Sequence, residues 1–125
     1  MKFFLDNNLG RQLADGMHAF GEDVTHILDH FKPDSRDTDW LPIVGEKQWI
    51  LITRDERIRY NPLEKAELVS NGVGAFFLGG KNRSRCELIQ QLVRNWPRIK
   101  ELAGATKRPF AFRIPPSGTK MQRIL

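Results

Sequence analysis

The chain has 125 residues, with 20 Lys and Arg against 15 Asp and Glu, a net charge of +5 and a sequence pI near 9.7. This length is typical of one domain, and no apolar run approaches the roughly 20 residues that span a membrane. The basic balance favours a polyanionic partner, and nucleic acid is the first candidate.

Cysteine content and the first residues indicate a compartment. A single cysteine, Cys86, excludes an internal disulfide, and no Cys or His pair has the spacing of a zinc site. The apolar start of the chain meets Asp6 too early to be the apolar region of a signal peptide. We therefore expect a soluble, cytoplasmic protein.

Apolar runs in the first half of the chain predict strands, and apolar residues three or four positions apart predict helices. The run from Trp49 to Ile52 is continuous, which is typical of a strand buried on both faces in a parallel sheet. Pro42 requires its helix to begin close to Asp39 or to bend. The expected elements are strands over 2–5, 23–28 and 49–52, and helices over 9–20 and from Asp37 to about Gly45.

The second half continues this alternation after a basic loop. Pro62 opens a predicted helix, and Ser84 is the expected N-cap of the longest helix, which Pro97 should kink or divide. Apolar and other residues alternate over 110–114, so this strand should be half exposed at the sheet edge. The expected elements are helices over 62–70 and 84–102 and strands over 73–78 and 110–114.

Strands that alternate with helices in this order predict a three-layer α/β/α domain with a mainly parallel central sheet. The domain should cover residues 1–114, because Pro115, Pro116 and Gly118 interrupt regular structure after it. Residues 115–125 are then expected to be a basic C-terminal tail.

Two acids follow apolar strands: Asp6 comes directly after the first, and Asp55 comes shortly after the run that ends at Ile52. Ligands of open α/β sheets bind beyond the carboxyl ends of the strands, so both acids should meet at one rim if their strands are parallel neighbours. Asp37 can join them from the start of a helix that packs on the central strand. Capping of the next helix remains an alternative explanation for each acid alone.

Clustered carboxylates repel one another, and a hard divalent cation with oxygen ligands relieves that repulsion. Asp6, Asp37 and Asp55 therefore predict a catalytic site for Mg²⁺ or Mn²⁺ rather than for zinc. Such a cation activates water and neutralises phosphate charge, which indicates phosphodiester hydrolysis. Asp39 is a weaker metal candidate, because it lies two residues along the same helix and N-capping explains it equally well.

Basic residues follow the two strands that should open on this rim, as a nuclease needs for phosphate contacts. Solvation of a loop explains any one of them alone. The residues predicted to bind nucleic acid are Arg54, Arg57, Arg59, Lys81 and Arg83.

The strand Phe-Phe-Leu before Asp6, the segment Asp37-Thr-Asp39-Trp40 and the segment Ile-Leu-Ile-Thr-Arg-Asp that ends at Asp55 resemble the PIN-like nucleases, especially the small domains of VapC-type toxins. The resemblance implies a PIN-like fold and a Mg²⁺- or Mn²⁺-dependent endoribonuclease, with catalytic and metal-ligating roles for Asp6, Asp37 and Asp55. It also implies an RNA substrate and an antitoxin partner that blocks the rim. Whether the chain forms a homodimer stays open.

Two features depart from the family pattern. No residue matches the additional Glu that larger PIN domains carry between the first acid and the helix-opening acid, and Arg57 stands where members often have a second Asp. A catalytically silent PIN-like module that binds nucleic acid or a protein is therefore an alternative.

A receiver-type phosphoacceptor domain is a further alternative, because it also has an Asp after its third strand and a Lys-Pro-Phe motif similar to Lys107-Arg108-Pro109-Phe110. Receivers carry paired acids after the first strand, however, where this chain has Asp6-Asn7-Asn8. Residues 101–106 also lack the pattern of the strand that should precede the lysine.

Overall fold

The computed structural model describes residues 1–55 and 57–125, apart from the side chains of Ile58 and Arg59. Strands and helices alternate along the chain as predicted. In chain order the elements are β1 (Phe3–Leu5), α1 (Arg11–Ala19), β2 (Val24–His26), the 3₁₀ helix η1 (Ile27–Asp29), α2 (Asp37–Glu46), β3 (Ile50–Thr53), α3 (Arg57–Tyr60), α4 (Pro62–Ser70), β4 (Gly74–Leu78), α5 (Arg85–Ala105), β5 (Phe110–Ile114) and β6 (Gln122–Arg123).

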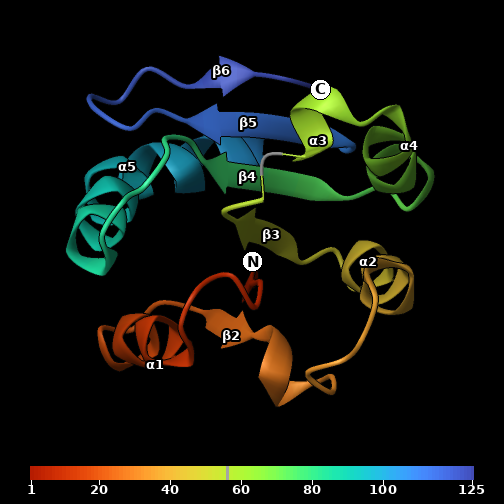
Figure 1. The fold of residues 1–125 in the computed structure, drawn as a ribbon, viewed down its shortest axis with the longest axis horizontal. Coiled ribbons are helices and arrows are strands. Elements are labelled where there is room, and N and C mark those ends of the chain that lie inside the picture. The colour runs from red at the N-terminus through yellow and green to blue at the C-terminus, as the bar shows by residue number, and fades with distance from the viewer. Residues whose placement is uncertain (56) are drawn as a thin grey trace.

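The strands form one six-stranded sheet in the order β2-β1-β3-β4-β5-β6 (Figure 1). Every pair from β2 to β5 is parallel, and β6 runs antiparallel to β5. β1 and β3 are direct neighbours, with Phe4 opposite Leu51. The prediction that these two strands are parallel neighbours is therefore confirmed, and their carboxyl ends share one edge of the sheet.

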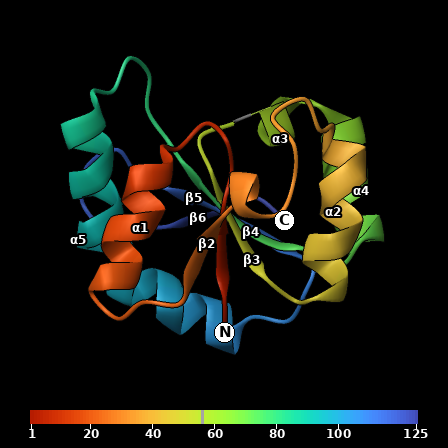
Figure 2. The same cartoon turned by 90° about the horizontal axis from the view of Figure 1, so that it is seen from below.

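Helices cover both faces of the sheet, which confirms the three-layer architecture (Figure 2). Side chains alternate across a strand, so Phe3 and Leu5 pack in the core under α1 and α5, while Phe4 packs in the core under α2 and α4. Both cores contain several aromatic side chains, among them Phe76 and Phe110 in the first and Phe77 and Trp40 in the second. Among the described residues, no helix is both long and apolar enough to cross a membrane.

Local chemistry explains where the observed elements differ from the predicted ones. The second strand ends at His26 because its backbone N–H donates to the Asp29 carboxylate at 3.1 Å and turns the chain into η1. The basic loop contains the short helix α3. Pro42 and Pro97 lie inside α2 and α5 without ending them, because both are exposed and water can take the carbonyls that they leave free.

Residues 115–125, expected to be a basic tail beyond the domain, return to the sheet as β6. The backbone N–H of Ile124 donates to the Ala111 carbonyl at 2.8 Å, and Ile124 and Leu125 pack on the core under α2 and α4. The prediction that the strand over 110–114 is a half-exposed edge is therefore wrong, because β5 lies between β4 and β6 and is mostly buried.

Candidate active site

The sheet changes its winding direction at β1. β1 lies between β2 and β3, and the helices that follow β1 and β2, α1 and α2, lie on opposite faces of the sheet (Figure 2). In open α/β sheets a crevice opens at such a point, beyond the carboxyl ends of the strands. Asp6 directly follows β1, and Asp55 follows β3 after one residue. The two predicted acids therefore meet where this topology forms a ligand site.

Thr53, the last residue of β3, links the two acids through its hydroxyl. Its Oγ1 donates a hydrogen bond to Asp6 Oδ2 at 2.9 Å and accepts one from the Asp55 backbone N–H at 3.0 Å. The backbone N–H of Asn7 donates to the other Asp6 oxygen at 2.6 Å. Thr53 is buried, so this hydroxyl fixes the orientation of Asp6 and the turn that presents Asp55.

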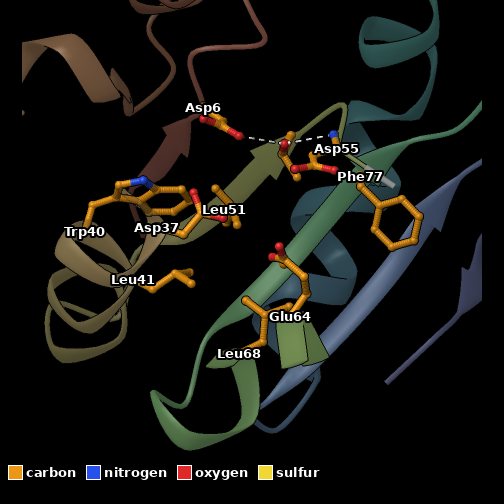
Figure 3. Close-up of a pocket in the computed structure, with 11 residues that line it drawn as sticks. Asp6, Asp37, Trp40, Leu41, Leu51, Asp55, Glu64, Leu68 and Phe77 are labelled. Carbon is orange, nitrogen blue, oxygen red and sulfur yellow. Dashed lines mark hydrogen bonds between the residues drawn. The ribbon is translucent and has the colours of Figure 1, made fainter. Parts of the chain in front are cut away.

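Asp6, Asp37 and Asp55 line one cavity over the core under α2 and α4, and Glu64 of α4 joins them as a fourth carboxylate (Figure 3). Sequence reasoning missed Glu64. Four separate segments supply these acids, which surround one common space in Figure 3. Thr53 also lines the cavity, and the other lining residues are apolar: Trp40, Leu41, Leu51, Leu68, Ala75 and Phe77.

The cavity disfavours ionisation of two of its acids. Burial, then the negative charge of Asp6, raises the pKa of Asp37 above its ordinary value, with a further contribution from Asp55. Burial likewise raises the pKa of Glu64, and the charges of Asp37 and Asp55 add to that effect. The carboxylates therefore lie close enough to repel one another, which is the condition that a bound cation relieves.

Burial of the Asp37 charge, together with this repulsion, predicts that Asp37→Asn stabilises the folded protein at neutral pH. A folded-state pKa above the unfolded value, near 3.8, means that the carboxyl contributes stability below that pH and loses it as the pH rises through the folded pKa. An amide has no such loss. Because the Asp37 side chain is 41% exposed, solvent screening limits the gain to a few tenths up to about 1 kcal/mol.

Urea unfolding of both proteins between pH 3 and pH 8 measures this difference. The gap in free energy of unfolding should open as the pH rises above about 4 and shrink below it. A variant that is less stable than the parent at pH 7 would show instead that Asp37 is held by favourable pairs.

Arg57 of α3 lies among these carboxylates. Its Nε donates to Asp55 Oδ2 at 2.7 Å and its Nη2 lies 2.5 Å from the same oxygen. Its guanidinium nitrogens also lie 3.9 Å from oxygens of Asp37 and Glu64. Burial disfavours the charge on Asp55, but the hydrogen bonds and charge of Arg57 more than offset it and lower the pKa of Asp55.

The donor chemistry fits a hard divalent cation, because the charged groups that line the cavity are all carboxylates among the described residues, and no described Cys or His lines it. In the side-chain conformations of this structure, however, no group of three or more His, Cys, Asp or Glu among residues 1–55 and 57–125 is arranged to hold one ion. The cation that Asp55 holds in this structure is the guanidinium of Arg57.

The structure does not bring Asp39 into the cavity. Its carboxylate accepts a hydrogen bond from the Arg36 backbone N–H at 2.8 Å, so it caps the start of α2 from the third helical position. Asp37 stands at the first position of the same helix and faces the cavity.

The basic residues predicted to bind nucleic acid lie in different parts of the structure. Arg54 and Arg57 line a shallow depression that adjoins the acids and also includes Tyr60. Arg83 is tied elsewhere, since it donates to the Pro116 carbonyl at 2.9 Å and pairs with Glu87 at 3.5 Å. Lys81 is exposed in the loop after β4. The side chain of Arg59 lies outside the described residues.

A family model described as a PIN like domain matches residues 1–80. No curated protein and no solved structure matches the chain. The family match replaces the receiver-type alternative, and residues 101–105, where that alternative needs a strand, belong to α5. Because the match covers more than half of the chain and includes every segment that supplies a cavity carboxylate, the chain belongs to the PIN-like domain family, within a superfamily of nuclease type.

Proposed function

We propose that the chain is a metal-dependent endoribonuclease that hydrolyses RNA phosphodiester bonds. The observation that carries the proposal is the convergence of Asp6, Asp37, Asp55 and Glu64 in one cavity at the winding reversal of the sheet. Four acids that repel one another in one cavity lower the stability of the fold, so a structural role alone does not explain them. Membership of a nuclease-type superfamily supports the same reading.

Asp6, Asp37 and Asp55 would hold Mg²⁺ or Mn²⁺, with Glu64 as a fourth oxygen donor. The bound cation supplies Lewis-acid stabilisation of the charge that develops on the phosphate. The chain's own contribution is positioning: the Thr53 hydroxyl orients Asp6 and fixes the turn at Asp55. The apolar floor of the cavity strengthens each charge interaction above it.

The depression beside the cavity supports a single-stranded nucleic acid as substrate. Arg54 offers a cation for phosphate, and Tyr60, 74% exposed, offers a ring on which a base can stack. The resemblance to VapC-type toxins favours RNA over DNA.

We further propose that the protein is the toxin of a toxin–antitoxin pair. An apolar groove between α1 and α5 supports a protein partner, since Phe20 is 91% and Val93 61% exposed there. Asn8 and Arg54 line both this groove and the depression beside the acids. An antitoxin segment in the groove would therefore reach the active rim. A second copy of this chain on the same groove is the homodimer alternative.

Incubation of the protein with a panel of single-stranded and structured RNAs tests the proposal. We expect cleavage with Mg²⁺ or Mn²⁺ and none with EDTA, because the carboxylates alone bring no cation to the phosphate. Retained RNA binding without cleavage under any metal would contradict the enzyme and favour the catalytically silent module. The observation that favours the silent module as a second candidate is the position of the Arg57 guanidinium among the acids.

A further inference from the structure

Arg57 directs its positive charge into the acid cavity although solvent is available to it. Its side chain is 64% exposed, yet its guanidinium forms a fork on Asp55 and lies 3.9 Å from Asp37 and from Glu64. One guanidinium thus faces three carboxylates. A two-pronged pair between a guanidinium and a carboxylate is stronger than an ordinary exposed ion pair, but solvent reaches it, so an incoming anion can take over the guanidinium.

We propose that Arg57 holds the place of the divalent cation and that an RNA phosphate draws it away when the cation binds. This inference rests on the proposed function and adds cooperativity between cation and substrate. The phosphate removes the guanidinium that competes with the cation, and the cation neutralises the carboxylates that repel the phosphate. A guanidinium makes the same two-pronged contact with phosphate as with carboxylate, so the exchange preserves its hydrogen bonds.

Two features of the rim allow the exchange. Asp55 also accepts the backbone N–H of Arg57 at 3.0 Å, and this bond keeps the turn in place after the side chain leaves. Arg57 lies in the depression that includes Arg54 and Tyr60, so a phosphate bound there comes within its reach. Acceptance of that phosphate removes the guanidinium from Asp55 and leaves the carboxylate to the cation.

The charges in the cavity favour simultaneous rather than separate binding of the cation and the phosphate. With Arg57 on Asp55, three further carboxyl groups line the cavity against one guanidinium, so its formal charge is negative, which attracts a cation but repels a phosphate. A phosphate that approaches alone meets this repulsion, and a cation that approaches alone meets the guanidinium. When both arrive, the cation faces the carboxylates and the guanidinium faces the phosphate.

Mn²⁺ titration by calorimetry without RNA tests the competition directly. Arg57→Gln should bind Mn²⁺ about tenfold or more tighter than the parent, since the hydrogen bonds of a charged fork no longer have to be broken. Arg54→Gln is the matched control: it removes the same charge from the same loop, and Arg54 forms no ion pair with an acid within the described part of the chain. Its Mn²⁺ affinity should change by less than about twofold.

A second titration includes a single-stranded 2′-O-methyl oligoribonucleotide, which resists cleavage. The oligonucleotide should tighten Mn²⁺ binding by the parent about tenfold and by Arg57→Gln clearly less, because the competitor is already absent there. Arg57→Lys, which keeps the charge but loses the fork, should lie between the two proteins. Thermal melting verifies that each variant is folded.

The outcomes separate this inference from the proposed function. Equal Mn²⁺ affinity of the parent and Arg57→Gln overturns the competition and leaves the metal-dependent enzyme standing. An equal oligonucleotide effect in both proteins overturns the exchange with phosphate. No Mn²⁺ binding by any variant, with or without the oligonucleotide, overturns the inference and the metal-dependent function together.

Discussion

Asp6→Asn and Asp55→Asn should each lower metal-dependent RNA cleavage by at least about 100-fold, because the loss of a ligand charge exceeds the roughly 10- to 100-fold cost of losing a supporting contact. Asparagine keeps the shape of the side chain and one acceptor oxygen. The Thr53 hydroxyl can reverse and accept from the amide at position 6, so the local network survives. We expect each variant to lose less than about 1 kcal/mol of stability.

Asp39→Asn is the matched control for this pair. It makes the same chemical change two residues from Asp37, on a carboxylate that caps α2 outside the cavity. Its cleavage rate should stay within about threefold of the parent, because capping contributes stability rather than transition-state binding. Cleavage unaffected in both Asp6→Asn and Asp55→Asn would show that the reaction uses another site. A loss in Asp39→Asn comparable to theirs would return Asp39 to the metal site.

Sequence alone predicted the scaffold of this site because its signals are local. The continuous apolar run before Thr53 identifies a strand buried on both faces, and β3 is fully buried between β1 and β4. The carboxyl ends of parallel neighbours must share an edge, so Asp6 and Asp55 could be placed together on the condition that their strands are neighbours, which the structure confirms. Asp37 followed from its position at the start of a helix.

Glu64 and Arg57 could not be placed in the same way. Glu64 has the same pattern as Asp37, an acid in the first turn of a helix that packs on the sheet, but first-turn acids commonly serve the helix dipole. The direction of Arg57 depends on α3, a four-residue helix that no periodicity reveals. Its charge was visible in the sequence, whereas its contact with Asp55, two residues away, depends on the backbone conformation of the turn into α3.

For β5 the alternation of side chains was interpreted correctly, but the predicted position of the strand at the sheet edge was wrong. Phe112 and Ile114 face the core under α1 and α5, as alternation predicts. The other face appeared polar because Arg113 interrupts it, but Ile124 and Leu125 pack on the core that contains Ala111, and β6 pairs with the outer edge of the strand. Burial there comes from a segment ten residues downstream, whose own two-residue strand carries no sequence signal.

Gly45→Ala should cost about 3 kcal/mol, at the upper end of the range for overpacking. A Cβ at this position of α2 would lie 1.9 Å from the backbone oxygen of Asn71, the C-cap of α4. A backbone oxygen cannot rotate away as a side chain can, so the two helices must separate by about 1 Å or more. Urea unfolding measures the loss, with Gly16→Ala as the control.

The control makes the same substitution in α1, where a Cβ meets nothing within 4 Å, and a helical Gly→Ala change there should stabilise by about 0.5–1 kcal/mol. Equal stabilities for the two variants would show that α2 and α4 yield without cost.

Gly45→Ala also tests how the site depends on the fold. α2 carries Asp37 in its first turn and α4 carries Glu64 in its first turn, so the separation of these helices sets the spacing between two cavity carboxylates. A displacement of about 1 Å in a catalytic constellation can cost roughly 100-fold in rate. Cleavage per folded molecule should therefore fall in Gly45→Ala and not in Gly16→Ala. Full activity in the folded fraction of Gly45→Ala would mean that the cation and its ligands set their own spacing.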